Sequence, residues 1–248
     1  MPTSELQPTS RLGLRPLIII MVKAPRAGAV KTRLSPLLCE QSIHQIATAF
    51  IQDTVVKAKG VTPHVMLAYT PRDGREVIKE ILRAHLEPDR LVWLEQQGQD
   101  LGARLEAATY RGAALGFSPL VLIGTDSPTL PPLFLEDAIR ALTIGAADVV
   151  LGPSEDGGFY LAGVREPVCE LYRNVAWSTS SVMAQAAANI AALKLRLIQL
   201  PPLHDVDTPA DLLRLGHDFA TNSKTRSLAP MTAQWMASHD TELRRAIV

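Results

Sequence analysis

The chain has 248 residues, which is enough for one substantial hydrophobic core and permits one large domain or two small ones. Hydrophobic residues make up 47% of it and charged residues 20%, as is usual for a globular protein, and 25 basic side chains balance 25 acidic ones. This balance argues against nucleic acid and against an anionic membrane surface as partners, but it leaves room for a local phosphate site.

The cysteines and the N-terminus indicate what kind of site the chain can hold and where in the cell we expect it. Cys39 and Cys169 form no CxxC pair and no metal-ligand spacing, so we expect both to be buried thiols. The N-terminus lacks the apolar core of a signal peptide and no apolar run is long enough to span a bilayer, which makes the cytoplasm the expected location. Residues 1–14 contain prolines, serines and threonines without periodicity, and predict a disordered tail.

The first predicted strand covers residues 17–22 and is apolar throughout, which is typical of a strand buried on both faces. The loop after it contains a Gly, a Pro, no acid and four cations, and it leads into a predicted helix over residues 36–59; the cations are Lys23, Arg26, Lys31 and Arg33. Cations before a helix N-terminus suit an anionic ligand, so we assign phosphate contact to Lys31 and Arg33, with Lys23 as a further contact. The alternative is a solvated loop. Val30 stands where a P-loop needs Gly, and no G-x-G-x-x-G follows the strand.

Two strand and helix pairs follow this loop. Strands are expected at residues 64–69 and 90–94, and helices at 74–85 and 101–114. Gln97 and Asp100 lie between the second of these strands and its helix, where polar groups could read a base or a sugar edge. The alternative role of Asp100 is the N-cap of the helix that follows.

The central feature of the chain is a short apolar strand at residues 120–123 followed by Gly-Thr-Asp-Ser-Pro at 124–128. Gly and Pro end the strand. Asp126 is therefore set down at the carboxyl end of a buried strand, where open α/β sheets bind ligands. It suits a divalent cation or a ligand hydroxyl. The alternative is that Asp126 or Ser127 only caps the helix that begins near Pro131.

The second half of the chain continues the alternation. A helix is expected over residues 133–144, a strand over 148–152 and a strand-like run over 159–163, with Glu155 and Asp156 in the turn between the last two. A hairpin would explain Asp-Gly-Gly by geometry alone, but the two acids also share the end of the sheet that holds Asp126, so they could contact an acceptor or a metal. A helix over 177–192, capped by Ser178 or Thr179, and a strand over 195–200 come next.

The last part of the sheet domain contains a second candidate acid. Thr208, Pro209 and Asp211 fit the N-cap, N1 and N3 positions of a helix, which leaves Asp207 free of a capping role. From Thr221 we expect a polar connector and then a C-terminal helix over residues 231–247, which could serve in a homodimer. The alternation predicts one α/β domain over residues 15–220 with a mostly parallel sheet, and a helical extension over 221–248.

Five motifs of this chain recur, in the same order, in a bacterial family of glycosyltransferases that belongs to the nucleotide-diphospho-sugar transferase superfamily. They are Pro25 with Lys-Thr-Arg-Leu at 31–34, Gln-Gly-Gln-Asp-Leu-Gly at 97–102, Gly-Thr-Asp-Ser-Pro at 124–128, Gly-Pro-Ser-Glu-Asp-Gly-Gly-Phe-Tyr-Leu at 152–161 and Asp-Val-Asp-Thr-Pro at 205–209. The resemblance covers about residues 17–215. Some members of this family are called arsenosugar-biosynthesis glycosyltransferases, and the chain is also similar to 2-phospho-lactate guanylyltransferase and to molybdenum-cofactor guanylyltransferases.

The resemblance implies a GT-A fold, a Rossmann-like three-layer α/β/α sandwich that binds a nucleotide together with Mg²⁺ or Mn²⁺. It places Asp126 at the metal, Lys31 and Arg33 in the phosphate loop, and Pro25 and Gly124 in motifs that bind the nucleotide. Relatives often carry Asp-x-Asp at the metal, whereas this chain has Gly-Thr-Asp with a single acid. The second ligand therefore comes from elsewhere in the chain, with Asp207 as our candidate, or is replaced by water, which Mg²⁺ accepts readily.

The sequence thus predicts a metal-dependent transferase that uses a nucleotide-sugar and an unidentified small-molecule acceptor, with Asp126 and Asp156 as catalytic residues. One alternative is a nucleotidyltransferase that uses a nucleoside triphosphate and releases pyrophosphate. Another is a nucleotide-binding protein without turnover. The sparse glycines of the first loop favour sugar transfer, because Gly28 is flanked by side chains that leave less room to wrap a triphosphate.

Overall fold

The computed structural model describes residues 14–26 and 28–245. Seven strands of this described part form one sheet in the order β3-β2-β1-β4-β6-β5-β7. The strands are β1 (Leu17–Lys23), β2 (Val65–Thr70), β3 (Val92–Glu95), β4 (Leu120–Ile123), β5 (Val149–Pro153), β6 (Phe159–Val164) and β7 (Leu197–Gln199). Every pairing is parallel except those of β6, which runs antiparallel to β4 and β5 because a tight hairpin joins it to β5. The predicted, mostly parallel sheet is confirmed.

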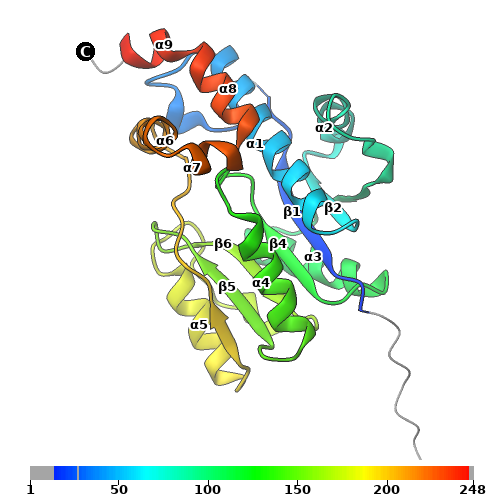
Figure 1. Cartoon of the computed structure of the whole chain (residues 1–248). Helices are drawn as coiled ribbons and strands as arrows, with labels where there is room; N and C mark the ends of the chain where they lie inside the picture. Colours follow the sequence, from blue (N-terminus) through cyan, green and yellow to red (C-terminus); the bar gives the residue numbers. More distant parts are fainter. Residues whose placement is uncertain (1–13, 27, 246–248) are drawn as a thin grey trace, which may run out of the picture.

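Helices cover both faces of the sheet (Figure 1). On one face pack α1 (Glu40–Val61), α2 (Arg75–Leu82) and α4 (Pro132–Thr143), and on the other pack α3 (Leu101–Ala114) and α5 (Val182–Ala192). Strand β1 serves both layers, since Ile18 and Ile20 belong to the first apolar cluster and Leu17 and Ile19 to the second. Side chains that alternate between two buried faces explain the unbroken apolar run. The three-layer sandwich is confirmed.

The parallel register brings the carboxyl ends of four strands to one edge of the sheet. Lys23 of β1 pairs with Thr70 of β2, Glu95 of β3 lies beside Tyr69, and Ile123 of β4 lies beside Ile20. The segments that leave these ends carry every candidate of the first half of the chain, and the first of them contains a short 3₁₀ turn (Thr32–Leu34) before α1. Ligand chemistry is expected at this edge.

Up to residue 245, where the description of the structure ends, the C-terminal part forms four helices rather than a connector and one helix. They are α6 (Pro209–Thr221), α7 (Ser223–Leu228), α8 (Pro230–Ser238) and α9 (Asp240–Arg245). The predicted helix over 231–247 is wrong because α8 ends where His239 leaves the helical conformation, and Ile247 lies outside the described residues. The predicted connector contains α7, which Asn222 caps. Helices α6, α8 and α9 pack with α1 around a third apolar cluster that includes Phe50 and Trp235.

Two further expectations need correction. The helix predicted from Trp177 begins at Val182, because Ser178 has a left-handed φ of 64° and neither it nor Thr179 caps the helix. Cys39 is exposed, since it precedes α1 at the surface, whereas the side chain of Cys169 lies outside the described residues. Within residues 14–26 and 28–245, no helix combines the length and the apolar character that crossing a bilayer requires.

Candidate functional site

Asp126 is free of the capping role that the sequence left open. Helix α4 begins after Pro131 without any side-chain cap, so neither Asp126 nor Ser127 serves that helix. The carbonyl of Asp126 accepts a hydrogen bond of 2.8 Å from the Val206 amide, which joins the loop after β4 to the loop after β7. The Asp126 side chain remains 49% exposed. It is therefore held at the edge of the sheet and open to a ligand.

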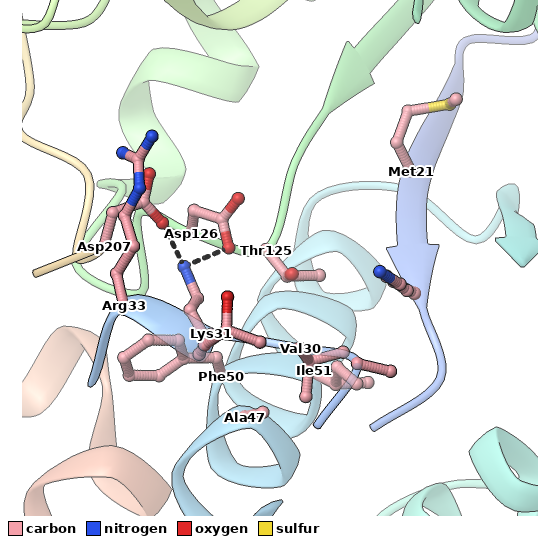
Figure 2. Close-up of a pocket in the computed structure, with 13 residues that line it drawn as sticks. Met21, Val30, Lys31, Arg33, Ala47, Phe50, Ile51, Thr125, Asp126 and Asp207 are labelled. Carbon is pink, nitrogen blue, oxygen red and sulfur yellow. Dashed lines mark hydrogen bonds and ion pairs between the residues drawn. The ribbon is translucent and has the colours of Figure 1, made fainter. Parts of the chain in front are cut away.

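Lys31 lies between Asp126 and Asp207 (Figure 2). Its Nζ is 2.5 Å from Asp126 Oδ1 and 2.8 Å from Asp207 Oδ1, and it also donates to the Val206 carbonyl at 2.8 Å. Burial acts against the charge of the ammonium, but the two carboxylates outweigh it and raise the pKa of Lys31 above its ordinary value. The structure thus brings together one predicted phosphate ligand and both predicted metal ligands.

Local sequence explains why Asp207 is available. Thr208 caps α6 and forms the predicted capping box with Asp211, whose carboxylate accepts hydrogen bonds from the amides of Asp207 and Thr208. The box fixes the backbone of Asp207 while its side chain points to Lys31. Sequence reasoning was correct about the cap, and the position of Asp207 at the cleft follows from it.

The remaining cations of the first loop divide into two groups. Lys23 and Arg33 line the cavity that contains Lys31 and form no ion pair with any described residue. Arg26 instead pairs with Asp73 at 2.7 Å. The cavity measures about 300 Å³ and extends from the carboxylates to Ala47, Phe50 and Ile51 of α1 (Figure 2). Two unpaired cations beside a carboxylate pair can hold an anion and its counter-ion together.

A second cavity of about 300 Å³ shares Met21, Lys23 and Asp126 with the first. Its other walls come from the carboxyl ends of the strands and the start of α3; these residues are Val22, Thr70, Gln96, Leu101, Arg104, Leu105, Leu122, Ile123, Gly124, Phe159 and Tyr160. Gly124, a predicted nucleotide contact, therefore lines the cleft. Apolar walls with a few polar groups are typical of a small-molecule site.

Three predicted contacts lie outside both cavities. The Asp100 carboxylate accepts from the Ala103 amide at 2.8 Å, so its alternative role as the α3 N-cap is the one observed. Gln97 is exposed and lines a separate cavity of about 350 Å³ beside α3. Pro25 is buried beneath the first loop. The neighbouring Gln96, which sequence reasoning missed, lines the second cavity, while its amide donates to the Ala68 carbonyl at 2.7 Å.

The β5–β6 turn holds the other predicted catalytic acid. Asp156 is exposed and its Oδ1 accepts from the Gly158 amide at 2.9 Å, which is the geometry of a turn. Glu155 forms a two-point ion pair with Arg214 of α6 at 2.5 and 2.9 Å, so its carboxylate already has a cationic partner. Of the two acids in this turn, Asp156 is the one that is free to meet a ligand.

Asp205 is a further residue of the site that was not predicted, although it lies in the 205–209 motif two residues before Asp207. Its carboxylate accepts a hydrogen bond from Ser127, immediately after Asp126. Burial raises the pKa of Asp205 to about 6, and the charges of Asp126 and Asp156 act in the same direction, against the neighbouring hydroxyls. The carboxylates of Asp126 and Asp156 are thus close enough to Asp205 to oppose its charge.

A divalent cation fits this arrangement. Asp126 and Asp207 direct carboxylate oxygens at one position that already holds a positive charge, and hard oxygen donors are what Mg²⁺ and Mn²⁺ prefer. In the described part of the chain, no three His, Cys, Asp or Glu side chains are grouped so as to hold a metal. The pair would therefore need phosphate oxygens or water to complete the shell, as is usual for Mg²⁺.

Comparison with known proteins gives a family and a fold. The family model described as "Uncharacterized protein conserved in bacteria (DUF2064)" matches residues 53–179. No curated protein matches the sequence significantly. Among solved structures, a "putative nucleotide-diphospho-sugar transferase" from Desulfovibrio desulfuricans G20 is 27% identical with a TM-score of 0.84, over 94% of this chain and 99% of that one.

More distant structures share the fold alone. A cytidylyltransferase from Leptospira borgpetersenii is 12% identical with a TM-score of 0.55, over 93% of this chain and 97% of that one. A 4-diphosphocytidyl-2C-methyl-D-erythritol synthase from Anaerococcus prevotii is 9% identical with a TM-score of 0.54, over 84% and 96%. The architecture is therefore one that proteins named for nucleotide-dependent transfer also use.

Proposed function

Because the chain belongs to the DUF2064 family of bacterial proteins, and because its cleft joins two carboxylates to a cationic loop, we propose that it is a metal-dependent transferase with a nucleotide-activated donor. We propose further that the donor is a nucleotide-sugar and the reaction glycosyl transfer to a small-molecule acceptor. The observation that carries the proposal is the convergence of Asp126 and Asp207 on one cation position beside Lys23 and Arg33.

The two cavities suggest how a donor would lie. The first, lined by Lys23, Lys31 and Arg33, would take the diphosphate. The second, which is mostly apolar and opens at the ends of β1, β2 and β4, would take the nucleoside. Asp126 lines both, so it would stand at their junction, beside the diphosphate. A divalent cation bound by Asp126 and Asp207 would supply neutralisation of the charge on the departing diphosphate.

The chain's own residues would perform the remaining chemistry. The acceptor oxygen forms a bond to the anomeric carbon, the bond from that carbon to the phosphate oxygen breaks, and its electron pair leaves on the nucleoside diphosphate. Asp156, which is exposed and close enough to Asp205 to oppose its charge, is our candidate to take the acceptor's proton. Arg33 and Lys31 would stabilise the charge of the leaving group.

Nucleotidyl transfer is the second candidate. One observation favours it: the acids of the site come from separate loops, after β4 and after β7, in place of the Asp-x-Asp run that the glycosyltransferase resemblance leads one to expect. In that reaction a nucleoside triphosphate would transfer its nucleotide to the acceptor and pyrophosphate would leave. Both reactions use the same acids and cations, so the distinction lies in the product.

Product identification tests the proposal. The protein is incubated with Mn²⁺ and either a panel of nucleotide-sugars or a panel of nucleoside triphosphates, and the released phosphate species is identified, with Asp126→Asn as the control. We expect a nucleoside diphosphate from a nucleotide-sugar, at least as slow hydrolysis when the acceptor is missing. Pyrophosphate released from a triphosphate, and lost in the Asp126→Asn variant, would replace sugar transfer with nucleotidyl transfer. Binding without any product would indicate a nucleotide-binding protein.

A further inference from the structure

The Lys31 ammonium lies in a cage of oxygen atoms. Asp126 Oδ1 is 2.5 Å away, Asp207 Oδ1 and the Val206 carbonyl are each 2.8 Å away, and the ring of Phe50 lies 5.6 Å below. Only 9% of the Lys31 side chain is exposed. An ammonium has three N–H donors, and here each has an oxygen to receive it.

The cage exists independently of the loop that supplies Lys31. Its oxygens belong to the segments after β4 and β7, which are joined by the 2.8 Å bond from the Val206 amide to the Asp126 carbonyl. Ser127 and Asp205 make a second bond between the same segments. Lys57 of α1 also fixes the segment after β4, because it donates a hydrogen bond of 2.6 Å to the Pro128 carbonyl. Removal of Lys31 would therefore leave the oxygens in place around a position suited to a cation.

The backbone of Lys31 has a conformation that is uncommon for a residue with a side chain. Its φ of 46° and ψ of 37° are left-handed, a conformation that favours glycine. Its ammonium is bound to two carboxylates that line the same cavity in which a diphosphate would lie. If a divalent cation replaced the ammonium in the cage, Lys31 would no longer be bound to the carboxylates.

We propose that Lys31 is a place-holder for the divalent cation. In the free protein its ammonium pairs with Asp126 and Asp207, and when a metal–diphosphate complex enters, Lys31 leaves the carboxylates and pairs with the phosphates. This inference rests on the proposed metal site. Its consequence is that free metal binds weakly because it competes with an internal cation, whereas metal and diphosphate each strengthen the binding of the other.

A purely structural role for Lys31 leads to the opposite result. If the ammonium only ties the first loop to the two acidic segments, its loss loosens those segments and metal affinity falls or stays the same. If it is a place-holder, its loss removes a competitor and metal affinity rises. The direction of the change separates the two roles.

The test measures Mn²⁺ binding by the electron paramagnetic resonance signal of the free ion, for the full chain alone and with pyrophosphate. Lys31→Met removes the charge and keeps the stem. Lys23→Met is the matched control for Mn²⁺ binding without pyrophosphate, because Lys23 lies in the same cleft and contacts neither carboxylate. We expect Lys31→Met to bind Mn²⁺ about tenfold more tightly than the natural protein, the change that corresponds to the loss of one competing charge-assisted interaction. Its affinity for pyrophosphate with Mn²⁺ should fall by about tenfold or more for the same reason.

Each outcome has a distinct meaning. Unchanged or weaker Mn²⁺ binding by Lys31→Met, with binding lost in Asp126→Asn, overturns the place-holder and leaves the proposed metal site intact. No Mn²⁺ binding by any of the proteins, with or without pyrophosphate, overturns the metal site and the place-holder together. Thermal unfolding shows whether each variant folds. If Lys31→Met does not, Lys31→Gln removes the charge while keeping a hydrogen-bonding group, and the same rise in Mn²⁺ affinity is expected.

Discussion

The turn that carries Asp156 depends on Gly157, and Gly157→Ala should damage it far more than an ordinary glycine substitution. Gly157 has a φ of 92°, its amide donates to the Ser154 carbonyl at 3.1 Å, and its carbonyl accepts from the Met183 amide at 2.8 Å. A Cβ at this position would overlap the backbone of Ser180. The hairpin is thus pressed directly against the start of α5.

Gly116 supplies the matched control. Its φ of 80° is similar, but a Cβ there would meet nothing within 4 Å. Gly116→Ala should therefore cost only the strain of the left-handed conformation, about 1–2 kcal/mol. Gly157→Ala adds a steric conflict with backbone that cannot move aside cheaply, and overpacking costs about 1–3 kcal/mol. We expect a total loss of about 2–5 kcal/mol in the free energy of unfolding for Gly157→Ala.

Urea unfolding followed by circular dichroism measures both losses. If the hairpin positions the catalytic acid, transfer activity under conditions where both variants are folded should fall in Gly157→Ala and persist in Gly116→Ala. Equal losses of stability for the two variants would refute the reasoning, because they would show that the contact with Ser180 contributes nothing. Full activity in a folded Gly157→Ala variant would remove the turn, and Asp156 with it, from the reaction.

Three further changes test other parts of the account. Arg33→Ala should weaken the binding of a nucleoside diphosphate by roughly tenfold or more, because hydrogen bonds to charged groups contribute about 1.5–3 kcal/mol. Binding of the bare nucleoside, measured by the same calorimetry, should not change. Equal losses of affinity for both ligands would indicate a folding defect instead. Asp53→Asn should lower the free energy of unfolding by about 1–3 kcal/mol in urea titrations. The buried carboxylate accepts hydrogen bonds from the amides of Met231 and Thr232 and from the Thr232 hydroxyl, and the Asn side chain has only one oxygen that can accept. An unchanged urea midpoint would contradict the role of Asp53 in capping α8. Hydrogen bonds from Arg196 lower the pKa of Asp148 to about 2, so the stability that this pair contributes is present above the unfolded pKa of about 3.9 and is lost as the pH falls from there to about 2. The difference in free energy of unfolding between Arg196→Ala and the natural protein should therefore shrink over that pH range. A constant difference would show that the ion pair is not its source.

Local patterns predicted much of the fold. The bounds of α3 and β4 agree with the structure, and the roles of Asp100 and Thr208 as helix caps follow from neighbours within four residues. The same locality explains the errors. The start of α8 depends on Asp53, a residue of α1 that lies far away in the sequence, and the start of α5 depends on a left-handed Ser178 that no neighbouring residue requires.

In the candidate site, too, local features could be predicted from the sequence and long-range contacts could not. That Asp126 stands at the end of a buried strand, and that Asp207 is spared from capping, could be predicted from spacing. That Lys31 joins them could not, because the contact spans 176 residues between Lys31 and Asp207 and leaves no periodic trace in the sequence. Asp205 lies two residues before Asp207 in the sequence, but its bond to Ser127 could not be predicted, because that bond requires the strand order of the sheet.

The central claim is that Asp126 and Asp207 bind a divalent cation that carries the donor's diphosphate. Calorimetric titration of a nucleoside diphosphate with and without Mn²⁺ tests it most directly, using the natural protein, Asp126→Asn and Asp207→Asn. We predict that Mn²⁺ strengthens binding to the natural protein, that this gain disappears in Asp126→Asn while thermal unfolding shows an intact fold, and that Asp207→Asn keeps part of it. The same Mn²⁺-dependent gain in all three proteins would contradict the account.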